Sequence, residues 1–373
     1  MTSDPMTVAS ASVVGPGIVL ACALTLLLAP RVASRERGGW LGEAVLAALL
    51  VLSLMATSGV VAFAAVAMTS LAIGYAARGV SRTAVVMLAL SAVAAGAAAT
   101  ALAAGQPRAA FLASIVAFAL RTGIFPLQSG VAALTDRSIP LQVWQLATLP
   151  VMVLVHLRFA NLDPWAFELA PLLVTVGAAS TLAYALIALA QRTLHGLLRA
   201  SMLMHGGMLF ASVGAAGRGH HAAAMLVAIT LGLALSGFGM MLASFEARVG
   251  PLTQLAPGGR ARAFPRLAAA VAIFGGAAVG LPGTAGFVAD DLLLHALWQE
   301  SVGSAVVTIV ASALLAVATL AGFARAFLGQ PVRQLAPDLL GGERVVVVAL
   351  LAWLVVLGVV PGVLVDPLAV LFP

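Results

Sequence analysis

Long apolar runs recur through almost the whole of this 373-residue chain and are separated by short polar interruptions. Each run is about 17–25 residues long, the length that an α-helix needs to cross the hydrocarbon core of a bilayer. Because a backbone exposed to lipid can satisfy its hydrogen bonds only within a helix or a closed barrel, runs of this length predict membrane-spanning helices. Hydrophobic residues make up 62% of the chain and charged residues 9%, which excludes an ordinary soluble domain.

The pattern predicts an all-α integral membrane protein with about 12 transmembrane helices. The run from Leu41 to Ala77 is too long for one helix, so we divide it near Thr57 to Gly59. The expected helices begin near Ala11, Leu41, Gly59, Thr83, Ala110, Leu141, Glu168, Ser201, Ala222, Ala263, Val302 and Val345. The polar N-terminal residues lack the features of a cleaved signal peptide, so the first run is expected to remain as a span.

The chain contains 19 arginines and no lysine. With the N-terminus outside, 15 arginines fall on one side of the membrane, three (Arg108, Arg158 and Arg218) on the other, and Arg121 lies within a span. Because positive residues concentrate in cytoplasmic loops, we expect the arginine-rich loops in the cytoplasm and both termini outside it. The membrane is then the inner (cytoplasmic) membrane of the cell. The arginines are dispersed, which excludes a nucleic-acid-binding patch.

Sequence patterns for enzymatic chemistry are missing from the chain. It has no phosphate-binding glycine loop, no dinucleotide fingerprint, and one cysteine, Cys22, which cannot form a cysteine metal site by itself. We therefore expect no cofactor, no metal site and no enzymatic activity of the chain by itself. Any redox or hydration chemistry would belong to a partner subunit.

Two apolar stretches contain glycine and proline at membrane depth. Gly123 and Pro126 follow Arg121, and the sequence Gly-Leu-Pro-Gly at 280–283 interrupts the run from 263 to 300. Such residues break membrane helices, and the freed backbone groups must then face protein or a water-filled cavity. Broken helices in two halves of a chain are typical of transporters with internal repeats. Two of the helices are therefore expected to be broken, near 121–126 and 280–291.

Four stretches along the chain share a family pattern. Residues 119–126 place a basic residue five positions before a proline, and 191–207 form an amphipathic segment leading into His-Gly-Gly. Residues 280–290 hold the second interruption and end in an acid, and Glu343 and Arg344 precede the last apolar run. In this order they resemble the proton-conducting membrane transporter family, which comprises the antiporter-like L, M and N-type subunits of respiratory complex I and the large subunits of multi-subunit sodium/proton antiporters.

The resemblance implies an inverted-repeat, antiporter-like arrangement of helices in a single membrane domain. Residues 1–109 would form a shortened N-terminal set of helices, two fewer than in the family, and residues 110–373 the antiporter-like core. It also implies a path of buried glutamate and lysine side chains at mid-membrane, whose protonation burial and neighbours adjust.

The chain departs from that path in its first half. Arg121 stands where the resemblance places a lysine, and an arginine stays protonated, so it can anchor charge or bind an anion but cannot relay a proton. The next lysine position falls at 150–152, with no titratable group before His156, and the upstream glutamate falls near Ala67. Of the path residues that the resemblance implies, only the ionisable residue of the second interruption has a counterpart of the same type, and that counterpart is Asp290. The first half is therefore predicted to be unable to relay protons.

The candidate ion or proton path accordingly lies around the second interruption. Asp290 and Asp291 follow it and could hold a proton or cation, or else form a helix-end pair that faces water. His295 lies one helical turn further and could form a relay pair with either acid, or be a solvated residue at a helix end.

Four further residues complete the candidate set for the path, and the first is His156, the first titratable group after the 150–152 position. His205 near the start of an apolar helix either lines the path or is hydrogen-bonded to backbone between helices. His195 is expected in a cytoplasmic loop, where it could admit protons or be an ordinary surface histidine. Arg121 is expected to be buried rather than to reach the surface from a helix end.

Two hypotheses of different class follow. In the first, the chain is a membrane subunit of a multi-protein complex that conducts protons or another small cation and couples this to a partner of the respiratory, hydrogenase or inorganic-carbon-uptake type. In the second, it is a non-conducting membrane anchor derived from an antiporter subunit. In both, the expected partners are the lipid bilayer and other membrane and cytoplasmic subunits, and in the first also protons or small cations.

Overall fold

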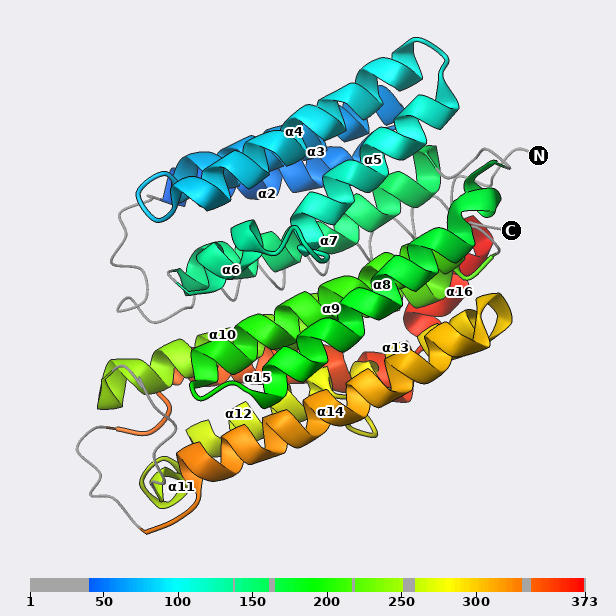
Figure 1. Cartoon of the computed structure of the whole chain (residues 1–373). Helices are drawn as coiled ribbons and strands as arrows, with labels where there is room; N and C mark the ends of the chain where they lie inside the picture. The colour runs from blue at the N-terminus through cyan, green and yellow to red at the C-terminus, as the bar shows by residue number, and fades with distance from the viewer. Residues whose placement is uncertain are drawn as a thin grey trace.

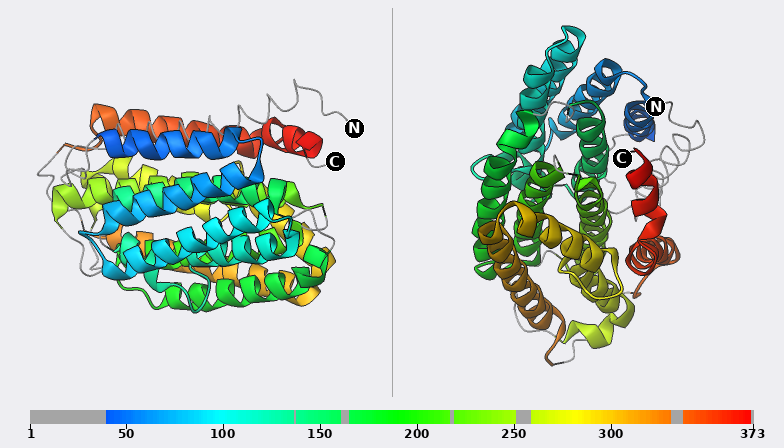
Figure 2. Two further views of the ribbon diagram at one scale, coloured as in Figure 1. Left: turned by 90° about the horizontal axis from the view of Figure 1, so that it is seen from above. Right: turned by 90° about the vertical axis from the view of Figure 1, so that its right-hand side faces the viewer.

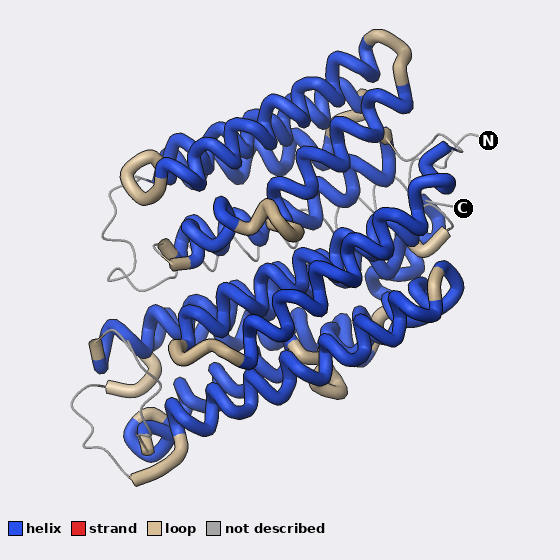
Figure 3. The backbone as a smooth tube through the Cα atoms, in the orientation of Figure 1, coloured by secondary structure: helices blue, strands red, loops and turns tan. Residues whose placement is uncertain are grey.

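A computed structural model describes residues 40–136, 138–160, 165–216, 219–250, 259–330 and 337–371, and these residues form helices and contain no β-strand (Figure 3). The predicted span near Ala11, Cys22 and Arg218 lie outside the described residues. The helices are α2 (Trp40–Met55), α3 (Gly59–Ala77), α4 (Arg82–Ala103), α5 (Pro107–Thr122), α6 (Ser129–Thr135), α7 (Ile139–Phe159), α8 (Trp165–Leu189), α9 (Leu194–Ala216), α10 (His221–Val249), α11 (Arg260–Ala263), α12 (Pro265–Ala278), α13 (Ala285–Glu300), α14 (Val302–Phe327), α15 (Gly341–Val359) and α16 (Gly362–Leu371).

Most of the long helices run side by side along one direction, so their connections gather at two opposite ends of an elongated bundle (Figures 1 and 2). The α3–α4 and α8–α9 connections and the start of α12 lie at one end, whereas the α4–α5 and α13–α14 connections lie at the other (Figure 1). Helices α2 to α4 form one flank, α12 and α14 the opposite flank, and α7 to α10 lie between them.

Seven of the described helices are long and apolar enough to cross a membrane: α3, α4, α7, α8, α10, α14 and α15. Helices α2 and α12 are apolar but shorter. Most of the helix starts lie within a few residues of those predicted from the apolar runs, and the first long run is divided at 56–58, between α2 and α3.

The start of α9 differs from the sequence prediction. The apolar run begins near Ser201, but the helix begins at Leu194, because the hydroxyl of Thr193 accepts a hydrogen bond from the Gly196 N–H at 2.9 Å and satisfies a free donor of the first turn. His195 was expected in a loop and lies instead in this first turn. Its position on the helix is therefore fixed.

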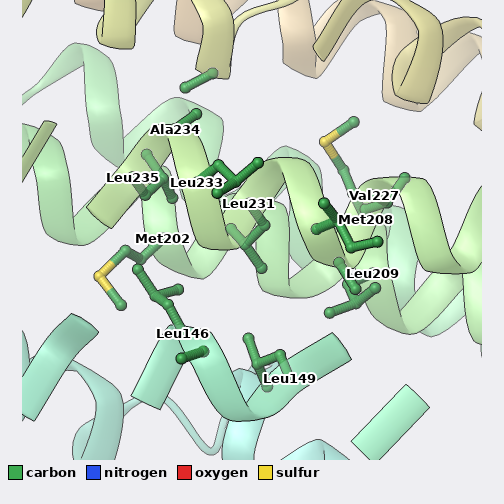
Figure 4. Close-up of a cluster of buried hydrophobic side chains, with 14 of the residues drawn as sticks. Leu146, Leu149, Met202, Met208, Leu209, Val227, Leu231, Leu233, Ala234 and Leu235 are labelled. Carbon is green, nitrogen blue, oxygen red and sulfur yellow. The ribbon is translucent and has the colours of Figure 1, made fainter. Parts of the chain in front are cut away.

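Helix α10 is the most enclosed of the seven helices long and apolar enough to cross a membrane. The most apolar 18-residue stretch of α10 is entirely buried, whereas only 28% of the corresponding stretch of α14 is. Leu231 and Leu235 of α10 lie among Leu146 of α7 and Met202 and Leu209 of α9 (Figure 4). Side chains from three helices thus form one continuous apolar core around α10, and this core holds the central helices in register.

Helices α4, α14 and α15 expose large apolar side chains on their outer faces. Val93, Leu320 and Val348 are 70%, 69% and 65% exposed in the isolated chain. In a helix that spans a bilayer such residues face lipid tails, which are as apolar as the side chains themselves. Apolar residues facing outward therefore fit a multi-pass membrane protein and need no protein cover.

Helices α8 and α9 approach each other closely through small residues. A Cβ added at Gly177 of α8 would lie 2.5 Å from the Ala211 nitrogen of α9, and one added at Gly207 would lie 2.7 Å from the Thr181 nitrogen. Backbone contact of this kind, through small residues spaced four apart, is a usual way for membrane helices to associate. It fixes α9, which carries the two candidate residues His195 and His205, against α8.

A buried ion pair joins the end of α10 to the start of α15. Arg248 donates to both carboxylate oxygens of Glu343, at 3.0 and 2.6 Å, and the two side chains are 8% and 1% exposed. The Glu343 carboxylate also accepts from the Leu340 N–H at 2.8 Å, which caps α15. A second pair, Arg199 with Asp136 at 2.5 Å, is more exposed.

We expect Glu343→Gln to lower the stability of the protein by about 3 kcal/mol, since it leaves the Arg248 guanidinium buried without its counterion. The matched control is Asp136→Asn, which breaks the exposed pair and should cost about 1 kcal/mol or less. The apparent melting temperature of both variants in detergent measures the difference. Equal melting temperatures would show that burial of the Arg248–Glu343 pair does not matter.

Candidate functional site

Helix α5 ends at the first predicted interruption. Pro107 stands in its first turn, where a missing N–H costs nothing, and the helix stops at Gly123, which adopts the left-handed conformation at φ 68°. The Gly123 N–H closes the helix on the Ala119 carbonyl at 3.0 Å. The chain then runs without regular helix from 123 to 128 before α6 begins at Ser129.

Side chains of neighbouring helices bind the backbone groups that this interruption leaves free. The Gln145 amide of α7 donates to the Arg121 carbonyl at 2.6 Å, and the Tyr184 hydroxyl of α8 donates to the Gly123 carbonyl at 3.0 Å. The Phe125 N–H donates to the Ser180 hydroxyl of α8 at 3.2 Å. Because no water is present in the bilayer core to take these bonds, the interruption depends on polar side chains of α7 and α8.

Arg121 lies in the last turn of α5 and is 1% exposed. Its guanidinium donates to the hydroxyls of Ser70 on α3, at 3.4 Å, and of Thr148 on α7. Its Nε has no hydrogen-bond partner among the described residues. The sequence predicted this burial from the apolar run before Arg121. A permanent charge thus lies in the interior, and its side-chain partners are two neutral hydroxyls.

His156 lies on the same face of α7 as Gln145 and Thr148 but about two turns beyond Thr148. It is 2% exposed, its Nδ1 is 2.8 Å from the Ser114 hydroxyl of α5, and its ring packs against Phe111. Its Nε2 is buried without a partner among the described residues. The structure therefore places His156 between α5 and α7 but about 12 Å along α7 from the Arg121 partner Thr148.

The second interruption separates α12 from α13 at residues 279–284. Gly280 and Gly283 adopt positive φ values of 77° and 85°, which residues with a side chain rarely take. The Leu281 N–H bonds back to the Gly276 carbonyl at 2.9 Å and closes the end of α12. The glycines of the Gly-Leu-Pro-Gly sequence are thus needed where the helix stops and where the chain turns into α13.

His205 of α9 reaches this second interruption. It is 6% exposed, and its Nε2 lies 2.6 Å from the carbonyl of Ala278, the last residue of α12. Its Nδ1 lies 2.7 Å from the Ser201 carbonyl, one turn back in α9. A neutral imidazole has one N–H donor, whereas the protonated ring has two, so only the protonated ring can donate to both carbonyls.

Asp290 faces the same turn from α13. Its Oδ2 would lie 2.8 Å from a Cβ added at Gly280, so the carboxyl group packs directly against that glycine. Asp290 is half-buried, and no hydrogen bond or ion pair to it is found among the described residues. Gly280 is therefore required both for its conformation and for the space that the carboxyl group fills.

Asp291 and His295 lie on α13 as exposed residues. The partner of His295 is Gln299, at 3.0 Å between the two Nε2 atoms, and its ring stands edge-on to His220 at 6.5 Å. Within the described residues no hydrogen bond or ion pair joins His295 to Asp290 or to Asp291, so neither alternative of the expected Asp-His pair is formed in this conformation. His295, Gln299 and His220 form a separate polar group.

Helix α9 contacts both interruptions through adjacent residues. His205 binds the end of α12, and a Cβ added at the next residue, Gly206, would lie 2.3 Å from the Thr122 carbonyl at the end of α5. Leu203 packs against Gly123 on the same side. The ends of two half-helices that lie about 150 residues apart in sequence therefore meet on one turn of α9.

At the other end of α9, His195 pairs with Glu246 of α10 at 2.7 Å. The two side chains are 29% and 17% exposed, so the pair is partly open to solvent. The sequence analysis did not select Glu246 or Gln145. The signal available for both was a polar residue inside a predicted span, but their partners are far away in sequence and cannot be identified from it.

No group of three or more His, Cys, Asp or Glu residues in the described parts of the chain is arranged to hold a metal ion. The polar side chains described at the two interruptions carry amide, hydroxyl, imidazole, carboxyl and guanidinium groups. These groups can bind protons, small ions and backbone atoms.

Comparison with known proteins gives a match to the family described as NADH:quinone oxidoreductase/Mrp antiporter, transmembrane, over residues 56–316. Subunit M of NADH-quinone oxidoreductase from Mycobacterium tuberculosis is 27% identical over 273 residues, which cover 69% of this chain and 48% of that protein. The chain thus spans about half the length of the curated relatives it matches.

Three solved structures share the fold. A chain of respiratory complex I from Thermus thermophilus with bound NADH superposes with a TM-score of 0.81 at 23% identity, over 95% of this chain and 83% of that one. A chain of the archaeal membrane-bound sulfane sulfur reductase gives 0.83 at 18% identity, over 96% and 66%. A chain of the Mrp complex from a Dietzia species gives 0.77 at 21% identity, over 97% and 44%.

We expect Gly206→Val to destabilise the protein by about 2 kcal/mol or more, because the new side chain would collide with the Thr122 carbonyl. The control is Gly96→Ala in α4, where nothing lies within 4 Å of an added Cβ. Alanine there should be neutral or stabilising by about 0.5–1 kcal/mol. Apparent melting temperatures in detergent would distinguish the two, and a Gly206→Val protein as stable as the wild type would contradict the contact between α9 and α5.

Proposed function

Because the chain belongs to the NADH:quinone oxidoreductase/Mrp antiporter transmembrane family, we propose that it is a membrane subunit of a multi-protein complex and that it conducts protons or another small cation. Conduction would be coupled to the chemistry of a partner subunit, of the respiratory or hydrogenase type or of the inorganic-carbon-uptake type. The chain itself is not the enzyme in this proposal. The subunit names of its relatives, which belong to multi-subunit membrane complexes, support the assignment.

The topology of the proposal has two interrupted spans. Helices α5 and α6 cross together as one, and α12 and α13 as the other, within an inverted-repeat core over 110–373. The end of the bundle that carries the starts of α4, α9 and α12 faces the cytoplasm, following the bias of the arginines. His195 and Glu246 lie at this end and would take up protons there.

The observation that carries the proposal is the contact of His205 with two backbone carbonyls at the second interruption. Since only the doubly protonated ring can donate to both, loss of a proton must release either Ser201 or Ala278. Protonation of His205 is thereby linked to the end of α12. Asp290, which packs against Gly280 of the same interruption, is the second group that can bind a proton or cation.

The path in this proposal lies in the second half of the chain. Arg121 occupies the first interruption and keeps its proton, so it acts as a fixed charge rather than as a relay. The imidazole of His156 can carry a proton, but its hydrogen-bond partner is Ser114. It also lies about 12 Å along α7 from Thr148, which binds Arg121. Asp291 and His295 would line the mouth of the path beyond Asp290.

One observation favours the alternative, a non-conducting anchor that holds a partner on the membrane. Two neutral hydroxyls are the side-chain partners of Arg121, so the described residues at the first interruption include no acid and base between which a proton could move. The second interruption speaks against this alternative. An anchor gains nothing from exposing backbone groups that His205 must then bind.

We expect Asp290→Asn to lower proton or sodium flux by about ten-fold or more, because an amide cannot bind and release a proton or carry the charge that attracts a cation. Flux is measured in liposomes that contain the complex with its native partner subunits. Asp136→Asn is the matched control, since it makes the same substitution in the exposed pair with Arg199, outside the proposed path, and should leave most of the flux. Full flux and full partner activity in Asp290→Asn would leave the anchor as the better explanation.

His205 is tested by two substitutions in the same assay. A purely structural His205 would be replaced well by Gln, which can still donate to the Ala278 carbonyl, and poorly by Leu. If His205 relays protons, both variants should lose flux by about ten-fold or more, whether or not they fold and assemble equally well. Near-normal flux in His205→Gln would assign a structural role to this histidine.

A further inference from the structure

Arg121 carries a positive charge for which the described residues supply no negative partner. The sequences of α3, α4, α6, α7 and α9, which surround the end of α5, contain no Asp or Glu. The one acid on α8, Glu168, lies in its first turn, beside the opposite end of α5, where Phe111 contacts Trp165. A buried ionised group without a counterion is costly, so the charge of Arg121 calls for compensation.

The hydroxyl partners of Arg121 do not provide that compensation. The Ser70 hydroxyl donates to the Val66 carbonyl at 3.2 Å, and the Thr148 hydroxyl donates to the Gln145 carbonyl at 2.8 Å. Each hydroxyl therefore turns a lone pair toward the guanidinium and holds it in place, but each is neutral. The C-terminal end of the α5 dipole supplies about half a negative charge at most.

Several N–H groups of the guanidinium remain available. A guanidinium has five donors, and Ser70 and Thr148 accept from Nη1 and Nη2. Nε–H has no acceptor among the described residues, although it is fully enclosed. The free donors lie inside the bundle, where a ligand must bring its own acceptors.

A second set of unpartnered polar atoms lies on the adjacent helix. Gln145, which binds the Arg121 carbonyl, leaves its Oε1 without a partner, and Gln142, one turn away, has neither amide atom bonded among the described residues. These side chains are 2% and 0% exposed. Buried amides of this kind are normally hydrogen-bonded, so their free atoms call for a polar ligand such as water beside α7. The free Oε1 of Gln145 can only accept a hydrogen bond, and Gln142 lies against Gly239 of α10, so neither amide is assigned to a bound anion.

We propose that Arg121, held by Ser70 and Thr148, binds one small monovalent inorganic anion at the first helix interruption. A single charge matches the one guanidinium, whereas a divalent anion would leave a negative charge buried in its turn. Chloride and bicarbonate both meet this description. The site is independent of conduction through Asp290, so it stands whether the chain transports ions or anchors a partner.

The test is equilibrium binding of radiolabelled chloride and radiolabelled bicarbonate to the detergent-purified complex, with gluconate as the bulky anion that maintains ionic strength. Saturable binding of either anion is expected in the wild type, and Arg121→Gln should weaken it by about ten-fold or more, because a charge-assisted hydrogen bond is lost. Which anion binds identifies the source. The exposed Arg199→Gln is the matched control and should bind as the wild type does.

Two further measurements keep the proposal testable if Arg121→Gln does not fold. Arg121→Lys retains the charge and should bind the anion more weakly but still saturably. Crystals of the wild-type complex grown with bromide should show an anomalous peak in contact with the Arg121 guanidinium. Absence of saturable binding of both anions in the wild type, or binding unchanged in Arg121→Gln, would overturn the proposal and leave water as the ligand of these groups. Where chloride is the anion that binds, absence of bromide at Arg121 would overturn it as well.

Discussion

The central constraint on this structure is that two helices stop inside an apolar bundle, where water cannot take the hydrogen bonds of the freed backbone groups. Side chains from neighbouring helices take them instead. Gln145 binds the end of α5, and His205 binds the end of α12. The same requirement places polar residues at membrane depth, and these are the residues that can interact with ions. The side chains that satisfy the backbone at the two interruptions are therefore also the ones that can bind ions.

Helix α9 connects the two interruptions because it carries a histidine and a glycine in succession. His205 reaches one half-helix, and Gly206 lets the other approach to backbone contact. A change in the hydrogen bonds of His205 therefore occurs next to a tightly packed contact with α5. This provides a physical connection by which the two halves of the chain can influence each other, although their chemistry differs.

The two halves differ because an arginine stands at one interruption and a carboxyl group at the other. A guanidinium keeps its charge and favours a bound anion, whereas Asp290 and His205 can exchange protons. The likeness to subunits of complex I, of an Mrp complex and of a sulfane sulfur reductase lies in the fold that carries these residues. Within that fold, the proposed function assigns a fixed charge to the first half of this chain and the movement of charge to the second half.

The sequence by itself determined the helical membrane fold, most helix starts and the two stretches where glycine and proline occur, because hydrophobic length and backbone conformation are local properties. It also identified Arg121, His205 and Asp290 as unusual residues for an apolar environment. Only the tertiary structure decided their partners: two carbonyls for His205, hydroxyls from α3 and α7 for Arg121, and Gln299 rather than Asp290 for His295. These contacts depend mostly on helix packing between distant segments, which no local pattern specifies.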